Sequence, residues 1–425
     1  MILKNDKKTI RAWTFYDWAN SVYPLVISSA IFPIFYEKVT KDQLNGVINF
    51  CGIKFINTAF YGYVVALSYV IVAFSSPLLS GMADYADSKK KFLQFFCYLG
   101  SISCMALYFF STEHIILSMM ALLFASVGYW GSLVFYNAYL PEIADSDQHD
   151  KISARGFSMG YIGSSLLLIF ILLVTQSDVL GFKMPIKYSF VLVGIWWVGF
   201  AQVTLRKLTP SGVVPKERAH LLTSGFKELK HVWDDLKQRL QLRRFLASYF
   251  MYNMGVQTVM IMAVPFAAKE VKGLETSNLI ISILLIQFLG VAGAVLMSRL
   301  SGIFGNIKTL GLTIFIWIGI CVYTYLMVDT PVEFYITASS VGLVMGGIQA
   351  LSRSTYSKML PQTKDHASYF SFYDVSEKIG LAIGTTTFGL IEDLTGGIRN
   401  SVLSLIIIFI LGFVLLLRVP KQQSN

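Results

Sequence analysis

Charged residues are scarce in this chain of 425 residues. Asp, Glu, Lys and Arg make up 14% of it and hydrophobic residues 55%, whereas soluble domains hold about 25% charged residues. A soluble core has too little interior to enclose so much apolar surface, but a lipid bilayer accommodates it. The composition therefore excludes an ordinary soluble protein, and we expect the net charge of +10 to report membrane topology, not nucleic-acid binding.

Sequence signatures of bound groups are also lacking. The four cysteines show no CxxC or other metal-ligand spacing. The chain contains neither an HExxH zinc motif nor a phosphate-binding loop of the GxxxxGK type. We therefore expect no cofactor, no metal site and no enzymatic activity, and the missing phosphate loop argues against ATP-driven pumping.

Long apolar runs dominate what remains. A membrane-spanning helix needs about 20 mostly apolar residues. Windows of this kind run approximately over 12–37, 58–83, 92–111, 115–139, 156–175, 188–206, 244–268, 275–298, 309–327, 332–351, 368–391 and 399–418. Lys and Arg accumulate in alternate connections, which by the positive-inside rule places both termini in the cytoplasm.

The longest connection, 207–243, divides the chain near its middle. Its apolar residues recur at steps of three and four, which predicts an amphipathic helix: Phe226, Leu229, Trp233, Leu236 and Leu240. We interpret this helix as a tether along the cytoplasmic surface, with a regulatory or partner-binding role as the alternative.

The two halves of the chain repeat. Leu140-Pro141 after the fourth window recurs as Leu360-Pro361 after the tenth. Such a parallel repeat predicts an all-α membrane protein of 12 transmembrane helices in two pseudo-symmetric six-helix bundles, the architecture of major facilitator transporters. The expected domains are 1–206 and 244–425, joined by the linker 207–243.

Three ionisable residues fall within the eleventh window. Asp374, Glu377 and Lys378 lie on adjacent faces of one helix near the predicted midplane. Charges at this depth are costly and mark solute or proton paths. Asp374 and Lys378, four residues apart, form either a structural ion pair or part of the path. Glu377 is then the carboxylate without a partner, and because desolvation favours its neutral form, we predict that it carries the coupled proton.

Polar residues in other windows are candidates for solute contact. In the first window, Asp17 is either an interfacial group that reaches the membrane surface or, with Asn20, a ligand for a polar solute. The remaining candidates are held open against interhelical hydrogen bonding as the simpler explanation; they are Tyr16, Tyr136, Asn137, Asn253 and Gln257, with Gln287 as a further polar group at this depth.

The connection 80–91 joins a small residue and an acid to a basic cluster. It resembles the cytoplasmic gate motif of the major facilitator superfamily, which implies that Asp84 binds a neighbouring helix end and stabilises the outward-facing state. Lys89, Lys90 and Arg155 are the expected basic gate residues. The second-half copy, 301–308, lacks the acid, so we do not expect a matching second gate.

Three segments carry a more specific resemblance. They are 16–21 (YDWANS), 153–163 (SARGFSMGYIG) and 349–354 (QALSRS), the last leading to Phe372-Tyr373-Asp374. Together they are similar to the autophagy-related vacuolar amino-acid effluxers and their bacterial relatives. The resemblance covers nearly the whole chain and implies efflux of small solutes, with amino acids as the best-known substrate class in the fungal branch.

These features predict a secondary active transporter that moves a small polar solute by alternating access, coupled to protons. Asp17 and Glu377 would meet an ammonium group or proton, while Lys378 or Arg155 would meet a carboxylate. The expected partners are the solute and the lipid bilayer, with the protein a monomer in the plasma (bacterial inner) membrane. The alternatives are an uncoupled uniporter and a receptor or scaffold that does not transport.

Overall fold

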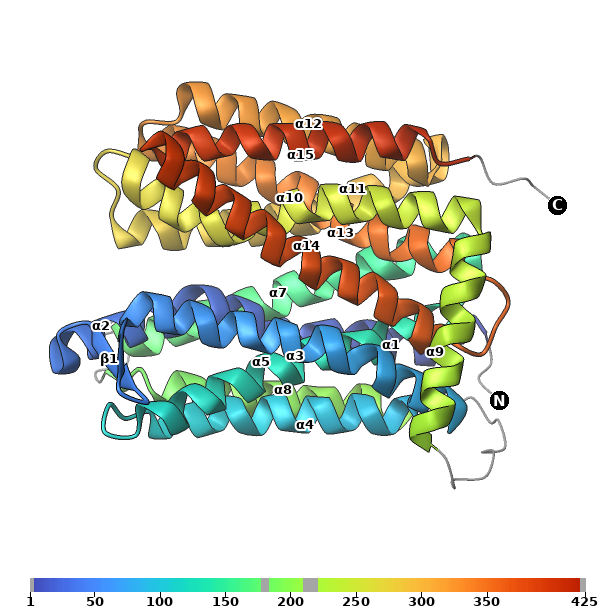
Figure 1. Cartoon of the computed structure of the whole chain (residues 1–425), viewed down its shortest axis with the longest axis horizontal. Helices are drawn as coiled ribbons and strands as arrows, with labels where there is room; N and C mark the ends of the chain where they lie inside the picture. Colours follow the sequence, from blue (N-terminus) through green and yellow to red (C-terminus); the bar gives the residue numbers. More distant parts are fainter. Residues whose placement is uncertain (1–3, 177–182, 209–220, 421–425) are drawn as a thin grey trace.

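The computed structural model describes residues 4–176, 183–208 and 221–420, and helices account for most of them (Figure 1). The first half contains α1 (Lys7–Asn20), the π-helix η1 (Tyr23–Ile31), α2 (Phe32–Leu44), β1 (Val47–Phe50), β2 (Ile53–Ile56), α3 (Asn57–Tyr85), α4 (Lys89–Ala106), the 3₁₀ turn η2 (Leu107–Phe109), α5 (Ile115–Ala138), α6 (Leu140–Ile143), the 3₁₀ turn η3 (Ser146–Gln148), α7 (His149–Gln176) and α8 (Tyr188–Lys207). The second half contains α9 (Leu221–Gln238), α10 (Leu240–Glu270), α11 (Thr276–Phe304), α12 (Asn306–Met327), α13 (Pro331–Met359), α14 (His366–Thr395) and α15 (Ile398–Leu417).

The long helices form two bundles that lie side by side. In Figure 1, the elements from α1 to α8 make the lower bundle and α10 to α15 the upper one. Within the described residues, eleven helical segments are long and apolar enough to cross a membrane. The charged helix α14 does not meet that criterion, yet it runs for 30 residues and packs against α10 and α3. The expected all-α fold of two six-helix bundles is confirmed.

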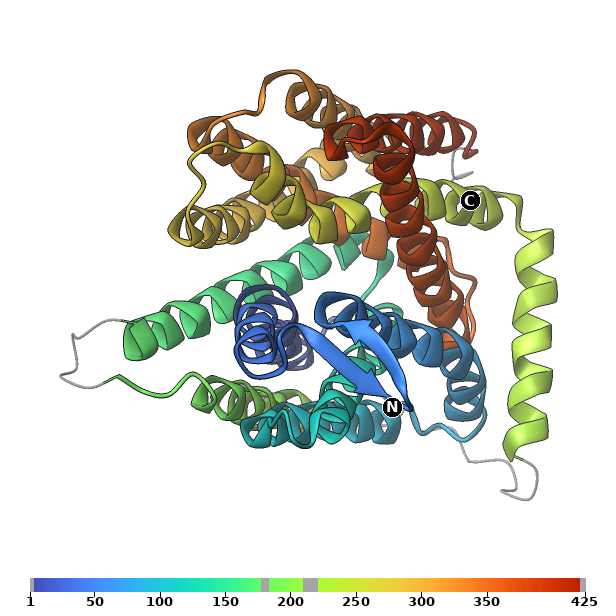
Figure 2. The same ribbon diagram turned by 60° about the vertical axis from the view of Figure 1, so that its left-hand side comes forward.

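The two ends of the molecule differ, and we name them by what they hold. At the terminal end, α1 begins, α15 ends and α9 crosses from one bundle to the other (Figures 1 and 2). At the hairpin end lies the antiparallel pair of β1 and β2. Part of the expected linker, residues 209–220, lies outside the described residues.

The first membrane segment is not one continuous α-helix. Between α1 and α2 the chain adopts the π-helix η1, which contains Pro24 and is followed by Pro33. Proline lacks a backbone N–H and displaces the helical ladder. Ser29 compensates in part, because its hydroxyl donates a hydrogen bond of 2.8 Å to the Pro24 carbonyl. Residues at such π segments are frequently functional.

A short hairpin at residues 47–56 was not expected from the sequence. Val47 pairs with Ile56 and Phe50 with Ile53, and a two-residue turn joins the strands. Cys51 and Gly52 in that turn both have positive φ, 52° and 83°, the geometry that suits the twist of a tight hairpin. Cys51 is exposed, whereas Cys97, Cys104 and Cys321 are buried.

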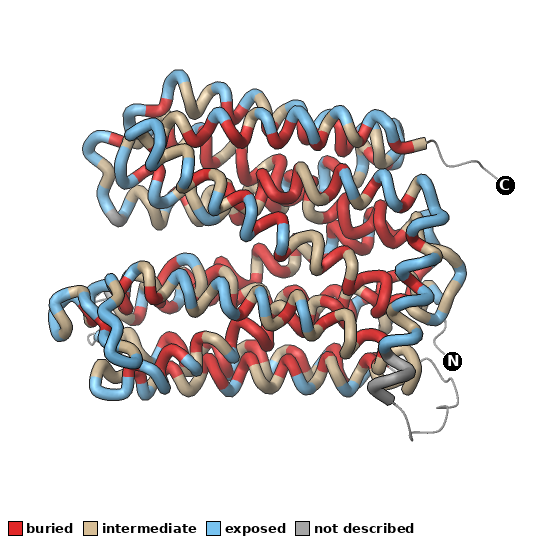
Figure 3. The backbone as a smooth tube through the Cα atoms, viewed as in Figure 1, coloured by how far each residue is buried: buried red, intermediate tan, exposed pale blue. Residues whose placement is uncertain are grey.

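Exposed apolar side chains cover the outer faces of both bundles. Phe74 is 82% exposed and Leu394 84% exposed, which is costly in water but favourable against lipid. Buried positions concentrate where helices face one another (Figure 3). Small residues allow the closest approaches, as where a Cβ on Gly346 would collide with the backbone of Gly290.

Candidate functional site

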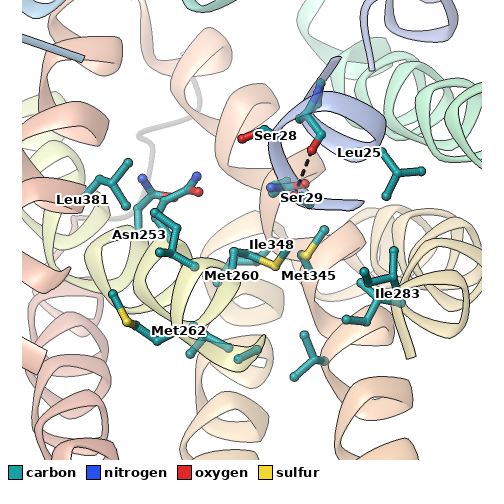
Figure 4. A pocket seen from close by; sticks show the side chains of 18 of the residues that line it. Leu25, Ser28, Ser29, Asn253, Met260, Met262, Ile283, Met345, Ile348 and Leu381 are labelled. Carbon is teal, nitrogen blue, oxygen red and sulfur yellow. Dashed lines mark hydrogen bonds between the residues drawn. The ribbon is translucent and has the colours of Figure 1, made fainter. Parts of the chain in front are cut away.

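A cavity of about 330 Å³ lies between the two bundles. Its wall follows the first membrane segment from Asp17 in α1 to Ser29 in η1, and continues on α10, α11, α13 and α14 of the other bundle. Figure 4 shows Ser28, Asn253 and Met345 around this space. Volumes of this order suit a small organic ligand.

An ion pair across the bundles forms the floor of the cavity. Arg353 in α13 and Asp17 in α1 approach to 3.3 Å, and both side chains are almost fully buried. Tyr136 donates a hydrogen bond of 2.8 Å to Asp17. The Arg353 guanidinium also donates to the Ser153 hydroxyl at 2.9 Å and carbonyl at 3.0 Å, and to Asn137 Oδ1 at 3.3 Å. These bonds close the cavity towards the terminal end.

Aromatic rings enclose the Arg353 guanidinium. Its centre lies 4.2 Å from the Phe157 ring centre, 4.9 Å from that of Trp13 and 5.5 Å from that of Tyr136. Such contacts stabilise a cation that has lost its water. The enclosed guanidinium is therefore held in one place, facing Asp17.

Gly156 in α7 makes room for this pair. A Cβ at that position would collide with the Asp17 carboxylate and the Arg353 guanidinium. Further along the same face of α7, Gly160 packs against Ser21 and Gly163 against Trp18. Glycines therefore let α7 and α1 lie close together beneath the cavity.

Glu377 in α14 lies in the cavity wall. Its carboxylate accepts a hydrogen bond of 2.8 Å from Gln257 and one of 3.3 Å from Tyr249, and it lies 3.9 Å from the Lys378 ammonium. Tyr249 in turn stacks on Tyr373 at 4.0 Å between ring centres. Glu377 thus has neutral donors and a distant cation but no ion partner at hydrogen-bonding distance.

Lys378 does not line the cavity, although Trp130, over which its ammonium lies, does. It bonds to Asp374 at 2.9 Å, its ammonium lies 3.7 Å from the Trp130 ring centre, and it is almost fully buried. Asp374 and Lys378 therefore form a paired unit between α14 and the first bundle, behind Glu377. One Asp374 oxygen, Oδ2, has no hydrogen-bond partner.

Two amides of the second bundle leave polar atoms without partners in the cavity wall. Asn253 Nδ2 and Gln287 Oε1 are buried and make no hydrogen bond. An unpaired buried donor or acceptor costs about 1–3 kcal/mol. One donor and one acceptor are therefore available to a polar solute.

Tyr16 and Asn20 do not join this set. Both are fully buried among the helices of the first bundle, outside the cavity wall. Asp17 is the neighbour of Tyr16 in α1, but successive residues point about 100° apart around a helix. Asp17 therefore faces the second bundle while Tyr16 faces into the first.

A polar layer closes the terminal end below the cavity. Asp84 at the end of α3 accepts hydrogen bonds from the backbone N–H groups of Ala367 and Ser368, at 3.3 and 2.7 Å. It therefore caps the N-terminus of α14, where a carboxylate is favoured by the helix dipole. Lys89 lies 3.6 Å from Asp84 and also pairs with Glu142, which receives a bond from His366.

A second contact between the bundles, which was not expected, also closes the terminal end, between the start of α7 and the ends of α11, α12 and α13. Asp150 at the start of α7 pairs with Lys358 at 2.7 Å and accepts hydrogen bonds from Asn306 at 2.7 Å and Ser301 at 2.8 Å. Donor and acceptor are exchanged relative to the Asp84 contact. There the connection 80–91 supplies the acid and the start of α14 supplies the N–H donors, whereas here the start of α7 supplies the acid and the connection 301–308 supplies the amide donor. The search for an acid in that connection therefore missed this contact.

Two expected gate residues lie outside these contacts. Arg155 is exposed on α7, because the faces occupied by Ser153 and Gly156 are the ones that meet the other elements. Lys90 follows Lys89 in the same helix and so points in another direction. The basic groups of the closing layer are Lys89 and Lys358, and the cation of the cavity is Arg353 rather than Arg155 or Lys378.

The run Gly156-Phe157-Ser158-Met159-Gly160 has the letters of the hydrolase motif GxSxG. That motif requires a sharp turn between a strand and a helix, which exposes the serine. Here the run lies within the continuous helix α7, and Ser158 is buried. It is a packing segment and not a nucleophile.

Comparison with known proteins gives consistent matches over the whole chain. The family described as vacuole effluxer Atg22 like matches residues 5–425. The MFS-type transporter YxiO of Bacillus subtilis (strain 168) is 32% identical over 430 residues, covering 100% of this chain and 97% of that protein. Autophagy-related protein 22 of Yarrowia lipolytica is 22% identical, covering 96% of this chain and 83% of that protein.

Solved structures show the same fold at low sequence identity. The human organic anion transporter MFSD10 superposes with a TM-score of 0.73 at 11% identity, covering 97% of this chain and 100% of its own. The E. coli fucose:proton symporter FucP gives 0.68 at 16% identity, covering 98% of both chains. An outward-facing bacterial homologue of the iron transporter ferroportin gives 0.69 at 12% identity, covering 99% and 100%. These likenesses confirm the major facilitator fold.

Proposed function

Because the chain belongs to the family of Atg22-like vacuole effluxers, we propose that it exports amino acids by proton-coupled alternating access. The protein acts as a monomer in the bacterial inner membrane, with the terminal end in the cytoplasm. The abundance of Lys and Arg in connections at that end supports this orientation. In this frame the structure is the outward-open state.

The distribution of charge in the cavity carries the substrate proposal. Asp17, Arg353 and Glu377 all line one cavity, with acids contributed by both bundles. A zwitterion places an ammonium group and a carboxylate within a few ångströms of each other, so it can meet an acid and the arginine at once. The unpaired Asn253 Nδ2 and Gln287 Oε1 add a neutral donor and acceptor for the same solute.

Glu377 is the proposed proton carrier. It faces the cavity, whereas the neighbouring Asp374 already has Lys378 as its partner at 2.9 Å. Gln257 and Tyr249 donate hydrogen bonds to Glu377 and hold it in place. A protonated Glu377 carries no charge. The change between the outward-facing and inward-facing states then does not require an ionised carboxylate to be enclosed in a low-dielectric environment. Asp374 and Lys378 fix the helix behind it.

Alternation requires the closing layer to open. Asp84 must leave the N-terminus of α14, Asp150 must leave Lys358, and Arg353 must leave Asp17. Each of these contacts joins the two bundles, so they separate when the cavity opens towards the cytoplasm. A ligand shifts such an equilibrium only if it binds one state more tightly than the other. A proton and a solute that bind next to the floor can provide this difference in affinity.

The test is transport in proteoliposomes with a panel of labelled amino acids, with and without a pH gradient. The wild type is compared with Glu377→Gln and with Asp393→Asn, a control that removes an exposed acid from the same helix. We expect gradient-driven movement in the wild type and the control, and exchange without gradient drive in Glu377→Gln.

Three results would contradict parts of this proposal. Transport that ignores the pH gradient would indicate a uniporter. Gradient drive that survives Glu377→Gln would move the proton to another residue. Silence across the panel with folded protein would remove the amino-acid assignment.

A further inference from the structure

The helix α9 lies across the terminal end and joins the two bundles. It packs against α3 of the first bundle and α14 of the second, and it runs across the ends of the long helices (Figures 1 and 2). From Phe226 onwards, where the side chains of α9 are described, its buried apolar residues are Val232 and Leu236. The predicted apolar stripe is therefore split, because Phe226 and Trp233 lie on a different, exposed face.

That exposed face carries aromatic and basic residues in alternation. Phe226, Lys230, Trp233 and Lys237 follow one another at steps of four, three and four, so they lie in one row along the helix. All four are exposed. We call this row the aromatic–lysine stripe.

Two contacts with α14 show which way the stripe points. Asp235 bonds to the hydroxyl of Tyr369, in the first turn of α14, while Trp233 stacks on Phe372 at 5.5 Å between ring centres. Phe372 lies about 4.5 Å further along α14 from the terminal end than Tyr369. Trp233 and Asp235 are on nearly opposite faces of α9. The Asp235 face therefore points away from the membrane, and the Trp233 face points towards it. The stripe therefore faces the depth at which the long helices meet lipid.

Charge adds to this placement. The Lys237 ammonium lies 5.1 Å from the Trp233 ring centre, and its partner Asp234, at 3.4 Å, is itself exposed. An exposed pair of this kind contributes little and leaves the cation available. Arg243 and Arg244 continue the basic surface into the start of α10, both exposed.

We infer that the aromatic–lysine stripe binds the anionic headgroups of the surrounding phospholipids. Aromatic side chains at the interface with lysines among them are the chemistry that anchors amphipathic helices to anionic bilayers. The occupant is the bilayer itself, which already surrounds α3 and α14. Because α9 contacts both bundles, lipid binding also favours the arrangement in which these helix ends are held together.

The test compares the full-length protein in nanodiscs of phosphatidylcholine with nanodiscs that also contain phosphatidylglycerol. Hydrogen exchange of α9 amides is the readout. Each lysine near an anionic surface contributes a factor of about five to binding. We expect slower exchange in the anionic nanodiscs, and loss of that difference in the double variant Lys230→Gln/Lys237→Gln.

The matched control is Lys41→Gln/Lys54→Gln, which removes two exposed lysines near the hairpin end and should keep the lipid effect. Equal exchange in the two lipids would overturn the inference, as would a lipid effect that persists in Lys230→Gln/Lys237→Gln. Hydrogen exchange of the wild type at increasing salt concentration provides an independent test. Protection that depends on anionic lipid but resists high salt contradicts an electrostatic contact.

Discussion

Arg353 in α13 lies 3.3 Å from Asp17 in α1, and this ion pair joins the two bundles directly beneath the cavity. Each charge is buried, so separating them leaves each ion without its counter-ion in a setting that excludes water. The pair therefore stabilises the state in which the two bundles meet at the floor of the cavity.

A mutant cycle on this pair separates its contribution to stability from its function. Asp17→Asn or Arg353→Gln alone leaves one buried charge unpaired and should destabilise the fold by about 3–5 kcal/mol. The double variant should recover much of that loss while transport stays impaired. Unfolding midpoints in detergent provide the measurement. If the two single effects simply add in the double variant, the residues are not coupled.

Gly156 allows the floor to close, so Gly156→Ala should disturb it. The added Cβ meets the Asp17 carboxylate and the Arg353 guanidinium, and overpacking of this kind costs about 1–3 kcal/mol. We expect lower transport together with a lower unfolding midpoint. Gly199→Ala is the matched control, because a Cβ there meets no atom within 4 Å. Equal effects at the two positions would show that backbone propensity, not the floor, is responsible.

Asp84 should control how often the terminal end opens. Asp84→Asn keeps the shape but removes the charge that caps α14, an interaction worth about 1 kcal/mol. The open fraction should rise about fivefold. Spin labels on cysteines placed at Lys91 and Gln362, both exposed at this end, report the separation in a Cys51→Ser background, because Cys51 is itself exposed. Asp42→Asn, at an exposed site away from this layer, is the control, and an unchanged distance distribution in Asp84→Asn would refute the gate assignment.

The attachment of α9 should survive mild acid. Hydrogen bonds from Arg239 and Tyr369 hold the pKa of Asp235 below its ordinary value. A carboxyl with a lowered folded pKa contributes stability above its unfolded pKa, which is lost as pH falls through the folded value. The contact should therefore stay intact down to about pH 4 and loosen only below it. Spin labels on α9 and α14 follow this contact, and release near neutral pH would show that Asp235 is not the group that holds α9 in place.

The sequence predicted the bundles because each span is a long apolar run, and length and composition alone decide whether a helix can cross a bilayer. It also placed Asp374, Glu377 and Lys378 on one helix, because spacing within a helix is fixed. Asp84 was found because an acid at a helix end followed by lysines is a local pattern. All three rest on neighbours in sequence.

The missed residues depend on neighbours in space. Arg353 falls two residues beyond the predicted window 332–351, so the windows place it in a connection outside the membrane, whereas α13 continues to Met359. Its partner Asp17 is more than three hundred residues away in the chain. Asp150 could not be found by looking for an acid in the connection 301–308, the counterpart of Asp84 in the repeat. In this contact the connection supplies the donor, Asn306, and the acid lies at the start of α7.

The turn of the hairpin offers a practical way to determine the orientation of the protein in the membrane. Cys51 is exposed there, while Cys97, Cys104 and Cys321 are buried. A thiol reagent that does not cross membranes should therefore modify the native protein at one position, and from one side only. In intact cells this reaction reads the sidedness of the molecule directly, without engineered tags: modification means that the hairpin faces outwards, and protection until lysis means that the molecule is inserted the other way round.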